Sequence, residues 1–283
     1  QYDFSPWSGG YWHNINIQMN YWHVFNTNLS ELFNPYMEYN ETFRKAGVQK
    51  AIDYITRHNP TALNPINEEN GWTIGTGATA FNIEAPGGHS GPGTGGFTTK
   101  LFWDYYDFTR DTQLLKEHVY PALLGISKFL SKTLKEQPDG TLLVDPSFSP
   151  EQKHNKQYYR TKGCIFDQSM ILETYQDLLK AAKILNSRDP FLKTVKEQIG
   201  KLDAIKIGES GQIKEFREET KYGEIGEYTH RHISHLCALY PGTTINNNTP
   251  EWMKAAIITL NKRGDKSTGW AMAHRQNLWA RAK

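Results

Sequence analysis

The stretch ILETYQDLLKAAKIL, residues 171–185, carries the clearest helix signal in this chain. Its apolar side chains recur three and four residues apart, as they do on one face of an amphipathic helix. They are Ile171, Leu172, Tyr175, Leu178, Leu179, Ala182 and Leu185. The polar residues between them, which include Glu173, Asp177 and Lys180, are predicted to lie on the opposite face.

Similar patterns recur along most of the chain, so an all-α fold is predicted. Further helices are expected at residues 14–32, 35–57, 96–108, 111–135, 190–202, 232–239, 250–262 and 270–282. Strand signals are confined to residues 141–144 and 212–215. Each of these follows a turn that contains glycine, which is typical of a short ribbon inside a loop.

Long polar loops at residues 58–95, 136–163 and 203–231 separate these helices. Loops of this length in a compact domain are usually functional, so we expect them to gather on one face of a ring of helices and form an active-site cleft. The Gly-rich stretch 85–96 lacks the preceding strand and the Gly-Lys-Ser/Thr ending of a phosphate-binding loop. A flexible active-site loop is predicted there instead.

The composition favours a carbohydrate enzyme over a nucleic-acid or membrane protein. The 283 residues contain 32 basic and 30 acidic side chains, and 13% are aromatic. The mean hydropathy is −0.65. Aromatic rings stack on the C–H faces of sugars, while amides, carboxylates and imidazoles bind their hydroxyls. There is no run of eighteen apolar residues that could span a membrane. Cys164 and Cys237 are each surrounded by apolar residues and are predicted to be buried thiols.

The segment YWHNINIQMNYW, residues 11–22, places amides and rings where an ordinary core helix has aliphatic residues. If a helix begins here, Asn14 can cap it with its side-chain oxygen. His13, Asn16 and Asn20 would then remain free to bind a ligand above the helix N-terminus. The alternative is an aromatic core helix with a polar cap.

Residues 145–151, with the sequence DPSFSPE, present an isolated carboxylate after two prolines that keep the backbone extended. Glu151 therefore has the setting of a general acid for a glycosidic oxygen, or it is a surface residue after a turn.

The sequence HRHISHL, residues 230–236, contains three histidines, but their spacing matches no zinc motif. Arg231 between the imidazoles would repel a cation. Binding of sugar hydroxyls by Arg231 and His232 fits better, so no metal or other cofactor is predicted. Residues 263–270, with the sequence RGDKSTGW, join two helical patterns, and Asp265 or Thr268 could cap the last helix.

Taken in order, NINIQMNYW, SPE, HRHISHL followed by YPG, and RGDKSTGW resemble the motifs of glycoside hydrolase family 95, which contains α-L-fucosidases and some α-L-galactosidases. The resemblance implies an (α/α)6 toroid and an inverting exo-acting enzyme that releases a terminal α-L-sugar, foremost α-L-fucose, from oligo- or polysaccharides. Glu151 would be the acid, and Asn14 and Asn16 would hold the attacking water. Arg231, His232 and Trp270 would bind the sugar. Room for the water implies roughly 6.5–9.5 Å between the acid and the amides.

The chain departs from the family pattern in the sugar subsite. Trp12 stands where fucosidases have histidine, with His13 one step later, and residues 71–84 replace a His-His-x-Thr-Asp-x-Trp-Gly segment. Trp72 or Glu84 could supply the lost contacts, and Trp12 and His13 are also expected to bind the substrate. The family's activating aspartate follows the Trp-Ala-Arg element, so it is expected beyond residue 283. The resemblance thus implies that residues 1–283 are part of a toroid domain with flanking β domains, in the periplasm or outside the cell.

Three alternatives accompany this interpretation. The first is an α-L-galactosidase of the same family. The second is a catalytically silent sugar-binding relative. The third is a polysaccharide lyase on a similar toroid, with Tyr228 as base beside Arg231 and His232; it would require Glu151 to point away from Asn14 and Asn16.

Overall fold

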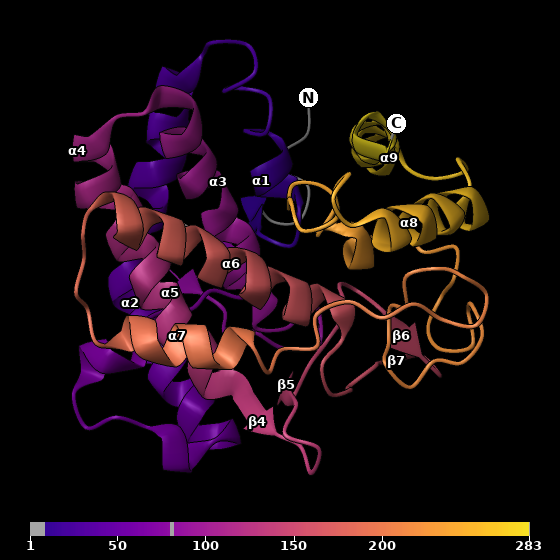
Figure 1. Cartoon of the computed structure of the whole chain (residues 1–283), viewed down its shortest axis with the longest axis horizontal. Coiled ribbons are helices and arrows are strands. Elements are labelled where there is room, and N and C mark those ends of the chain that lie inside the picture. Colours follow the sequence, from indigo (N-terminus) through magenta and orange to yellow (C-terminus); the bar gives the residue numbers. More distant parts are fainter. Residues whose placement is uncertain (1–8, 80–81, 283) are drawn as a thin grey trace.

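The computed structural model describes residues 9–79 and 82–282, and most of its regular structure is helical (Figure 1). The helices and helical turns are α1 (Asn16–Met19), η2 (Ser30–Phe33), α2 (Asn34–His58), η3 (Pro60–Ala62), η4 (Asn67–Asn70), α3 (Gly93–Thr109), α4 (Thr112–Leu114), η5 (Leu115–Val119), α5 (Tyr120–Thr133), α6 (Ile165–Ile184), α7 (Phe191–Ile199), η6 (Ser234–Leu236), α8 (Pro250–Arg263) and α9 (Gly269–Ala282). The predominantly helical fold is therefore confirmed.

The strands are short and antiparallel. One sheet joins β1 (Tyr11–Trp12), β2 (Gly77–Thr79) and β3 (Asn82–Ile83), while β4 (Leu134–Glu136) pairs with β5 (Leu142–Val144) and β6 (Lys153–His154) with β7 (Gln157–Tyr158). The ribbon predicted at 141–144 is confirmed as β5. The ribbon predicted at 212–215 is reduced to one isolated antiparallel bridge between Ile207 and Ile213, in which the N–H of Gly208 donates to Gln212 and that of Lys214 to Lys206. The N–H of Ile213 points away from this pair and donates to the hydroxyl of Thr259 over 2.9 Å.

Helices α3 and α6 form the centre of the larger hydrophobic core, and α5 packs against both. The first turn of α3 lies close to α6 because Gly93 and Gly96 have no Cβ there. A Cβ at Gly96 would come within 2.9 Å of the carbonyl oxygen of Met170. The Gly-rich stretch 85–96 therefore ends in a buried helix start, and the prediction of a flexible loop is wrong for its second half.

The predicted apolar face of α6 is confirmed, since Ile171, Tyr175 and Leu178 are fully buried. On the opposite, polar face Glu173 and Asp177 are also buried. Their charges are compensated. Asp177 accepts a hydrogen bond of 2.9 Å from Nζ of buried Lys100 on α3, and Glu173 accepts backbone and hydroxyl hydrogen bonds from residues 243–244.

Two of the predicted helices do not form. Residues 14–32 contain only α1, turns and η2. Amide side chains compete with the backbone for hydrogen bonds there, as when Gln18 donates to the carbonyl of His13 over 2.5 Å. Residues 232–239 contain only η6, because Arg263 donates to the carbonyl of His232 and Pro241 prevents a longer helix. The other predicted helices are present, with α4, η5 and α5 continuous over 112–133.

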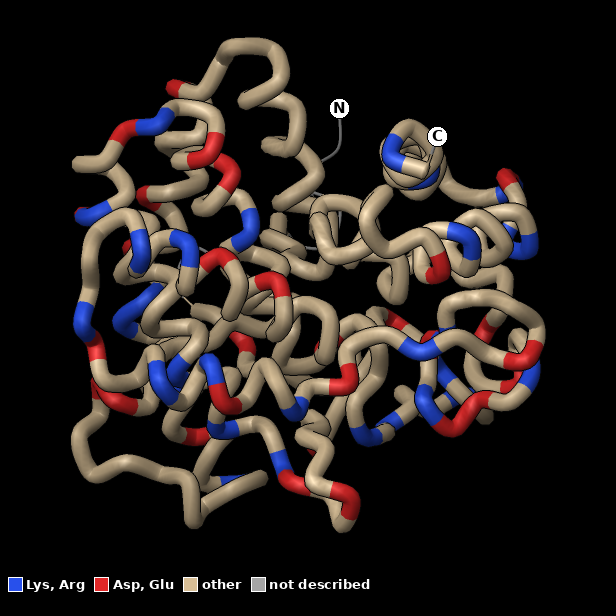
Figure 2. The backbone as a smooth tube through the Cα atoms, viewed as in Figure 1, with Lys and Arg blue, Asp and Glu red and all other residues tan. Residues whose placement is uncertain are grey.

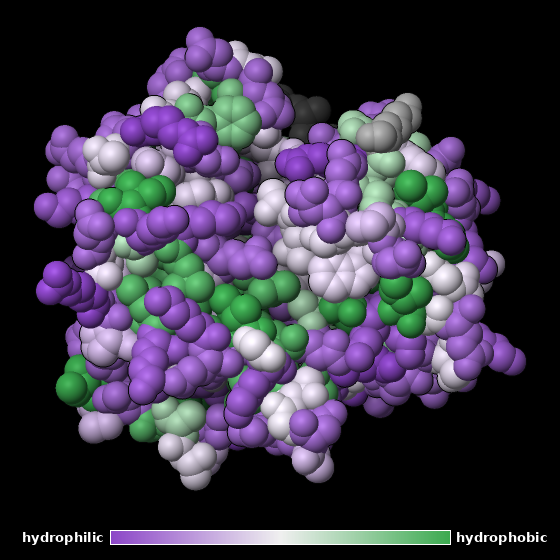
Figure 3. Space-filling view, in the orientation of Figure 1, coloured by the Kyte–Doolittle hydropathy of each residue, from purple (hydrophilic) through white to green (hydrophobic). Residues whose placement is uncertain are grey.

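Helices α8 and α9 cover a second, smaller hydrophobic cluster beside the larger core (Figure 1). Tyr240 packs against both clusters. Both cysteines are buried free thiols, as predicted. Basic and acidic residues are interspersed along the chain (Figure 2), and apolar surface appears as separate patches between hydrophilic side chains (Figure 3). Within residues 9–79 and 82–282, no helix is both long and apolar enough to cross a membrane.

Candidate active site

Glu151 lies in a loop whose backbone is fixed just before it. Ser147 and Thr161 exchange backbone hydrogen bonds of 2.9 and 3.0 Å. The hydroxyl of Ser147 also donates to the carboxylate of Asp167 over 2.6 Å. Asp167 is at the start of α6 and has no exposed surface, and this burial raises its pKa to about 6. The loop is therefore attached to the core, while the Glu151 side chain stays 17% exposed.

Side chains from three other segments converge on the Glu151 carboxylate. Asn14 donates its Nδ2–H to Oε1 over 2.7 Å, and the guanidinium of Arg231 donates to Oε2. Nδ1 of His89 lies 4.0 Å from Oε1, and Nε2 of His232 lies 3.9 Å from Oε2. Hydrogen bonds from a cation to a carboxylate are among the stronger ones in proteins. The structure thus brings together four of the predicted site residues, Asn14, Glu151, Arg231 and His232.

These residues come from the long loops. His89 is in the loop predicted at 58–95, Glu151 in that at 136–163, and Arg231 is at the end of that at 203–231. The expectation that the three loops gather is therefore confirmed for the residues around Glu151.

Asn14 reaches Glu151 because the residues before it belong to a sheet. Strand β1 pairs with β2, and the N–H of His13 donates to the carbonyl of Thr76 over 2.7 Å. Helix α1 has Ile15 at its N-cap and no side-chain capping bond. The predicted capping role of Asn14 is therefore wrong, because its amide group is turned toward the acid.

The predicted gap between the acid and the amides is also wrong for Asn14, which touches Glu151. The N–H end of the amide is drawn to the carboxylate. The other end, Oδ1, is buried and has no hydrogen-bond partner in the described part of the chain. Asn16 is exposed in α1. A carbonyl oxygen without a protein donor can accept a hydrogen bond from a ligand or a water.

Two buried imidazoles and an indole stand beside Arg231. The rings of His230 and His232 are stacked with centroids 5.4 Å apart, and the ring of Trp270 meets His232 edge-on at 4.8 Å. Burial lowers the pKa of His230 to about 4. Burial and the neighbouring His230 and Arg231 lower the pKa of His232 well below its usual value. Neutral imidazoles both donate and accept hydrogen bonds, as sugar hydroxyls require.

No three acidic, histidine or cysteine side chains are grouped as metal ligands within the described residues.

His89 is a candidate that the sequence analysis missed. Its Nε2 lies 3.0 Å from the hydroxyl of Tyr158, and its ring centroid lies 6.2 Å from that of Trp12. Trp12, predicted to contact the substrate, therefore lies beside a side chain that approaches Glu151. The available signal was a histidine inside the Gly-rich stretch, which was interpreted only as a flexible loop.

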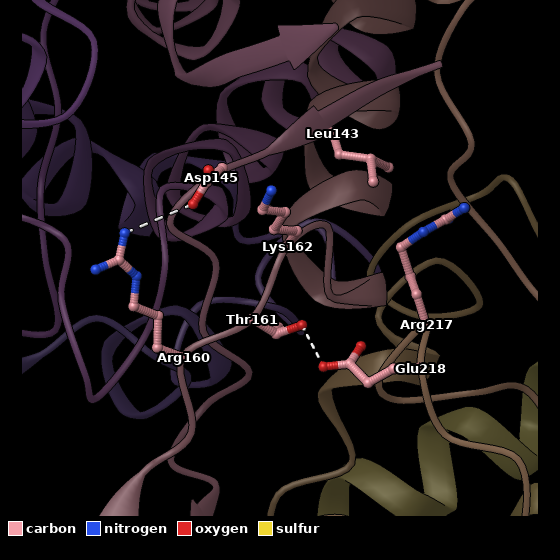
Figure 4. A pocket seen from close by; sticks show the side chains of 7 residues that line it. All are labelled: Leu143, Asp145, Arg160, Thr161, Lys162, Arg217 and Glu218. Atoms are coloured by element: carbon pink, nitrogen blue, oxygen red, sulfur yellow. Dashed lines mark hydrogen bonds and ion pairs between the residues drawn. The ribbon is translucent and has the colours of Figure 1, made fainter. Parts of the chain in front are cut away.

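A separate hollow of about 700 Å³ lies along the strand that leads to this loop (Figure 4). Its lining is mostly charged and polar, and it consists of Leu143, Asp145, Arg160, Thr161, Lys162, Arg217 and Glu218. Arg160 pairs with Asp145 at 3.6 Å, and Thr161 donates to Glu218 over 2.6 Å. None of the predicted site residues lines it, so its chemistry is secondary to that around Glu151.

Comparison with known proteins shows the family of the chain. Residues 2–283 match the family model named glycosyl hydrolase family 95 catalytic domain. The chain belongs to glycosyl hydrolase family 95. It is 31% identical over 288 residues to alpha-L-fucosidase 2 of Arabidopsis thaliana, a match that covers 98% of this chain and 32% of the relative. It is 32% identical over 292 residues to the probable alpha-fucosidase A of Aspergillus niger, covering 98% and 35% respectively. The chain thus spans about a third of the length of these relatives.

Trp72, one of the two residues expected to replace the lost family contacts, lies in the core. Trp72 is 5% exposed, and its indole N–H donates to the carbonyl of Ala122 over 3.2 Å. Its ring lies against Gly125 of α5. This buried, satisfied side chain has the environment of a packing residue, and the structure does not bring it to Glu151.

Glu84 and His13 are held by neighbouring backbone and rings. Glu84 is exposed, and its Oε2 accepts from the N–H of Gly77 over 3.2 Å. His13 is fully buried, stacks on Tyr39 at 5.6 Å, and its Nε2 lies 2.9 Å from the Tyr39 hydroxyl. Burial lowers the pKa of His13 to about 4. Sugar contacts by Glu84 and His13 stay predictions of the family resemblance.

Proposed function

We propose that this chain contributes the acid and the sugar-binding residues of an inverting exo-α-L-fucosidase built on an (α/α)6 toroid. The observation that carries the proposal is the convergence of Glu151, Asn14 and Arg231, at positions that match the family motifs. The names of the two relatives with the broadest matches, each an alpha-L-fucosidase or a probable alpha-fucosidase, support fucose as the sugar.

In the proposed reaction, protonated Glu151 donates its proton to the glycosidic oxygen as the bond to the sugar breaks. A water attacks the anomeric carbon from the opposite face. The carbonyl oxygens of Asn16 and Asn14 accept hydrogen bonds from this water, and the proton it loses passes to a base. The resemblance expects that base beyond residue 283. The attack inverts the configuration at the anomeric carbon.

Arg231, His232 and Trp270 bind the sugar in this proposal. The guanidinium offers a fork of donors, the neutral imidazole donates and accepts, and the indole provides an apolar face. His89 lies 4.0 Å from Glu151, and the ring of Trp12 lies beside that of His89, so both would contact the sugar or the leaving group.

An α-L-galactosidase is the second candidate. It is favoured by the altered residues 71–84 and by Trp12, which change the part of the family pattern that lines the sugar subsite. The lyase alternative is weakened, because it needs Glu151 to point away from Asn14 and the two side chains are hydrogen-bonded. A silent sugar-binding relative would have no use for a proton donor. A periplasmic or extracellular location stays a prediction, which cell fractionation can test.

The test is the release of fucose or galactose from aryl α-L-glycosides by the full-length gene product. Glu151→Gln should lose about 10²- to 10⁴-fold in kcat/KM on substrates with poor leaving groups. Glu197→Gln, at an exposed glutamate of α7, is the matched control and should match the parent. Equal activity in Glu151→Gln and parent would overturn the acid assignment.

Proton NMR of the first product separates the mechanisms. An initial β-anomer from an α-L-glycoside supports inversion, whereas an initial α-anomer contradicts it. Binding of fucose without any release from any aryl glycoside would favour the silent relative.

A further inference from the structure

Glu215 is a buried carboxylate that connects the two sides of the Glu151 loop. Its side chain is about 9% exposed. Oε1 accepts from the hydroxyl of Ser149 over 2.7 Å and from Nε2 of Gln152 over 3.1 Å. Ser149 lies two residues before Glu151, and Gln152 lies directly after it. The same carboxylate therefore holds the chain on both sides of the candidate acid.

Arg263, at the end of α8, holds the chain on both sides of Arg231. Its Nη1 donates to the carbonyl of His230 over 2.8 Å and to that of His232 over 2.5 Å. These two residues flank Arg231 directly. The Arg263 guanidinium thus fixes the backbone on both sides of the cation that binds Glu151.

Glu215 and Arg263 also bind each other. Nη2 of Arg263 donates to Oε2 of Glu215 over 3.1 Å, and the Arg263 side chain is only 1% exposed. The hydroxyl of Ser149 also lies 2.8 Å from that of Ser234, which ties the same two segments a second time. A buried ion pair of this kind is rigid, because either charge would be left without compensation if the other moved away.

We propose that Glu215 and Arg263 are positioning residues that set the orientation of Glu151 relative to Arg231 and Asn14. This inference rests on the proposed function of Glu151 as the acid. A proton donor must be held within about half an ångström of its productive position, and the side chains that fix its loop provide this precision. Neither Glu215 nor Arg263 touches the substrate in this arrangement.

Loss of a positioning residue and loss of a merely structural residue change the reaction rate differently for different leaving groups. A misplaced acid slows the departure of an alkoxide, which needs a proton. It spares fluoride, which leaves without one. Loss of folded protein lowers both rates by the same factor. The ratio of activities on the two substrates therefore reports the position of Glu151 independently of stability.

The experiment uses the full-length gene product with α-L-fucosyl fluoride and an α-L-fucosyl disaccharide. Glu215→Gln should lose at least about 10-fold more kcat/KM on the disaccharide than on the fluoride, since general acid catalysis contributes about 10²- to 10⁴-fold. Arg263→Lys should show the same selectivity in weaker form, because a lysine cannot bind both carbonyls and the carboxylate as a planar fork.

Glu173→Gln is the matched control. Glu173 is an equally buried carboxylate with several hydrogen bonds, but these go to residues 243–244, away from the Glu151 and Arg231 segments. It should lower the melting temperature without changing the ratio. If Glu215→Gln does not fold, Ser149→Ala, which removes one bond to Glu215, replaces it and should show the same preference for the fluoride.

The outcomes separate this inference from the proposed function. If Glu151→Gln is selectively slow on the disaccharide but Glu215→Gln or Ser149→Ala is equally slow on both substrates, the positioning role is overturned and the acid stands. If Glu151→Gln is not selective, the acid assignment itself fails.

Discussion

The amide nitrogen of Asn14 lies 2.7 Å from Oε1 of Glu151, although 137 positions separate the two residues in the chain. The N–H end of the amide binds the acid, and the carbonyl end stays without a protein partner among the described residues. One side chain can therefore orient the proton donor and still accept a hydrogen bond from water. Asn14 would therefore have two roles: with Asn16 it would hold the attacking water, and it would also orient the acid.

Asn14→Ala should lower kcat/KM about 10- to 100-fold, because it removes both the contact that orients Glu151 and an acceptor for the attacking water, and each such hydrogen bond is worth about 0.5–1.5 kcal/mol. Asn20→Ala provides the control, since Asn20 is an exposed asparagine at the end of the same short helix. Steady-state kinetics on an aryl α-L-fucoside measure both. If the two variants lose activity equally, the contact with Glu151 has no catalytic role.

Trp72 and Trp270 should respond differently to the same substitution. Trp72→Phe removes a buried indole that donates to Ala122, so it should destabilise the fold by about 1–3 kcal/mol and leave KM unchanged. Trp270 is half-buried and meets His232 edge-on, so Trp270→Phe should raise KM several-fold with a smaller change in stability. Urea unfolding and KM are measured for both. A raised KM for Trp72→Phe alone would return it to the substrate-binding residues.

The features best predicted from the sequence are those that depend on residues close together in the chain, namely helices and short motifs. The spacing of apolar residues predicts α6 and most other helices, and short motifs select Glu151, Asn14 and Arg231, which lie in contact in the structure. These signals depend only on neighbours in the chain, or on motifs met in a known order. They are independent of which distant residue provides a partner.

What the sequence could not predict depends on such distant partners. Glu173 is buried because residues 243–244 donate to it, and no periodicity within α6 reveals them. At the start of residues 232–239, the carbonyl of His232 is bound by distant Arg263 instead of by a helical N–H. His89, which lies in the turn between the paired residues Gly87 and Ser90, comes within 4.0 Å of Glu151 from a distant part of the chain. Each of these outcomes requires the three-dimensional contact.

Gly91 is expected to be essential to the packing beneath the Glu151 loop. A Cβ at Gly91 would overlap the carboxylate of Asp167, which binds Ser147. Gly91→Ala should therefore destabilise the protein by about 1–3 kcal/mol through overpacking. At Gly87, in the same stretch, a Cβ would meet nothing within 4 Å, so Gly87→Ala is the control and should be nearly neutral. Thermal unfolding compares them, and equal melting temperatures would contradict this packing.

The buried imidazole of His13 should make stability depend on pH. Burial lowers its pKa from 6.5 to about 4 in the folded protein. Above pH 6.5 the ring is neutral in both states, so stability is at its full value. Below pH 6.5 the unfolded chain binds a proton that the folded protein does not, so stability falls until the pH reaches about 4. From pH 7.5 to 5.0 the loss from this group is about 2 kcal/mol.

His13→Gln removes the titration while keeping a polar group near Tyr39. The variant should be less stable than the parent at pH 7.5, because the stacked ring is lost. The difference should shrink by about 2 kcal/mol at pH 5.0, since only the parent pays the proton-linked cost. Burial also lowers the pKa values of His230 and His274 to about 4, so both proteins keep a residual acid sensitivity. Urea unfolding at the two pH values measures the change, and a constant difference would show that His13 is protonated as readily in the folded protein as in the unfolded chain.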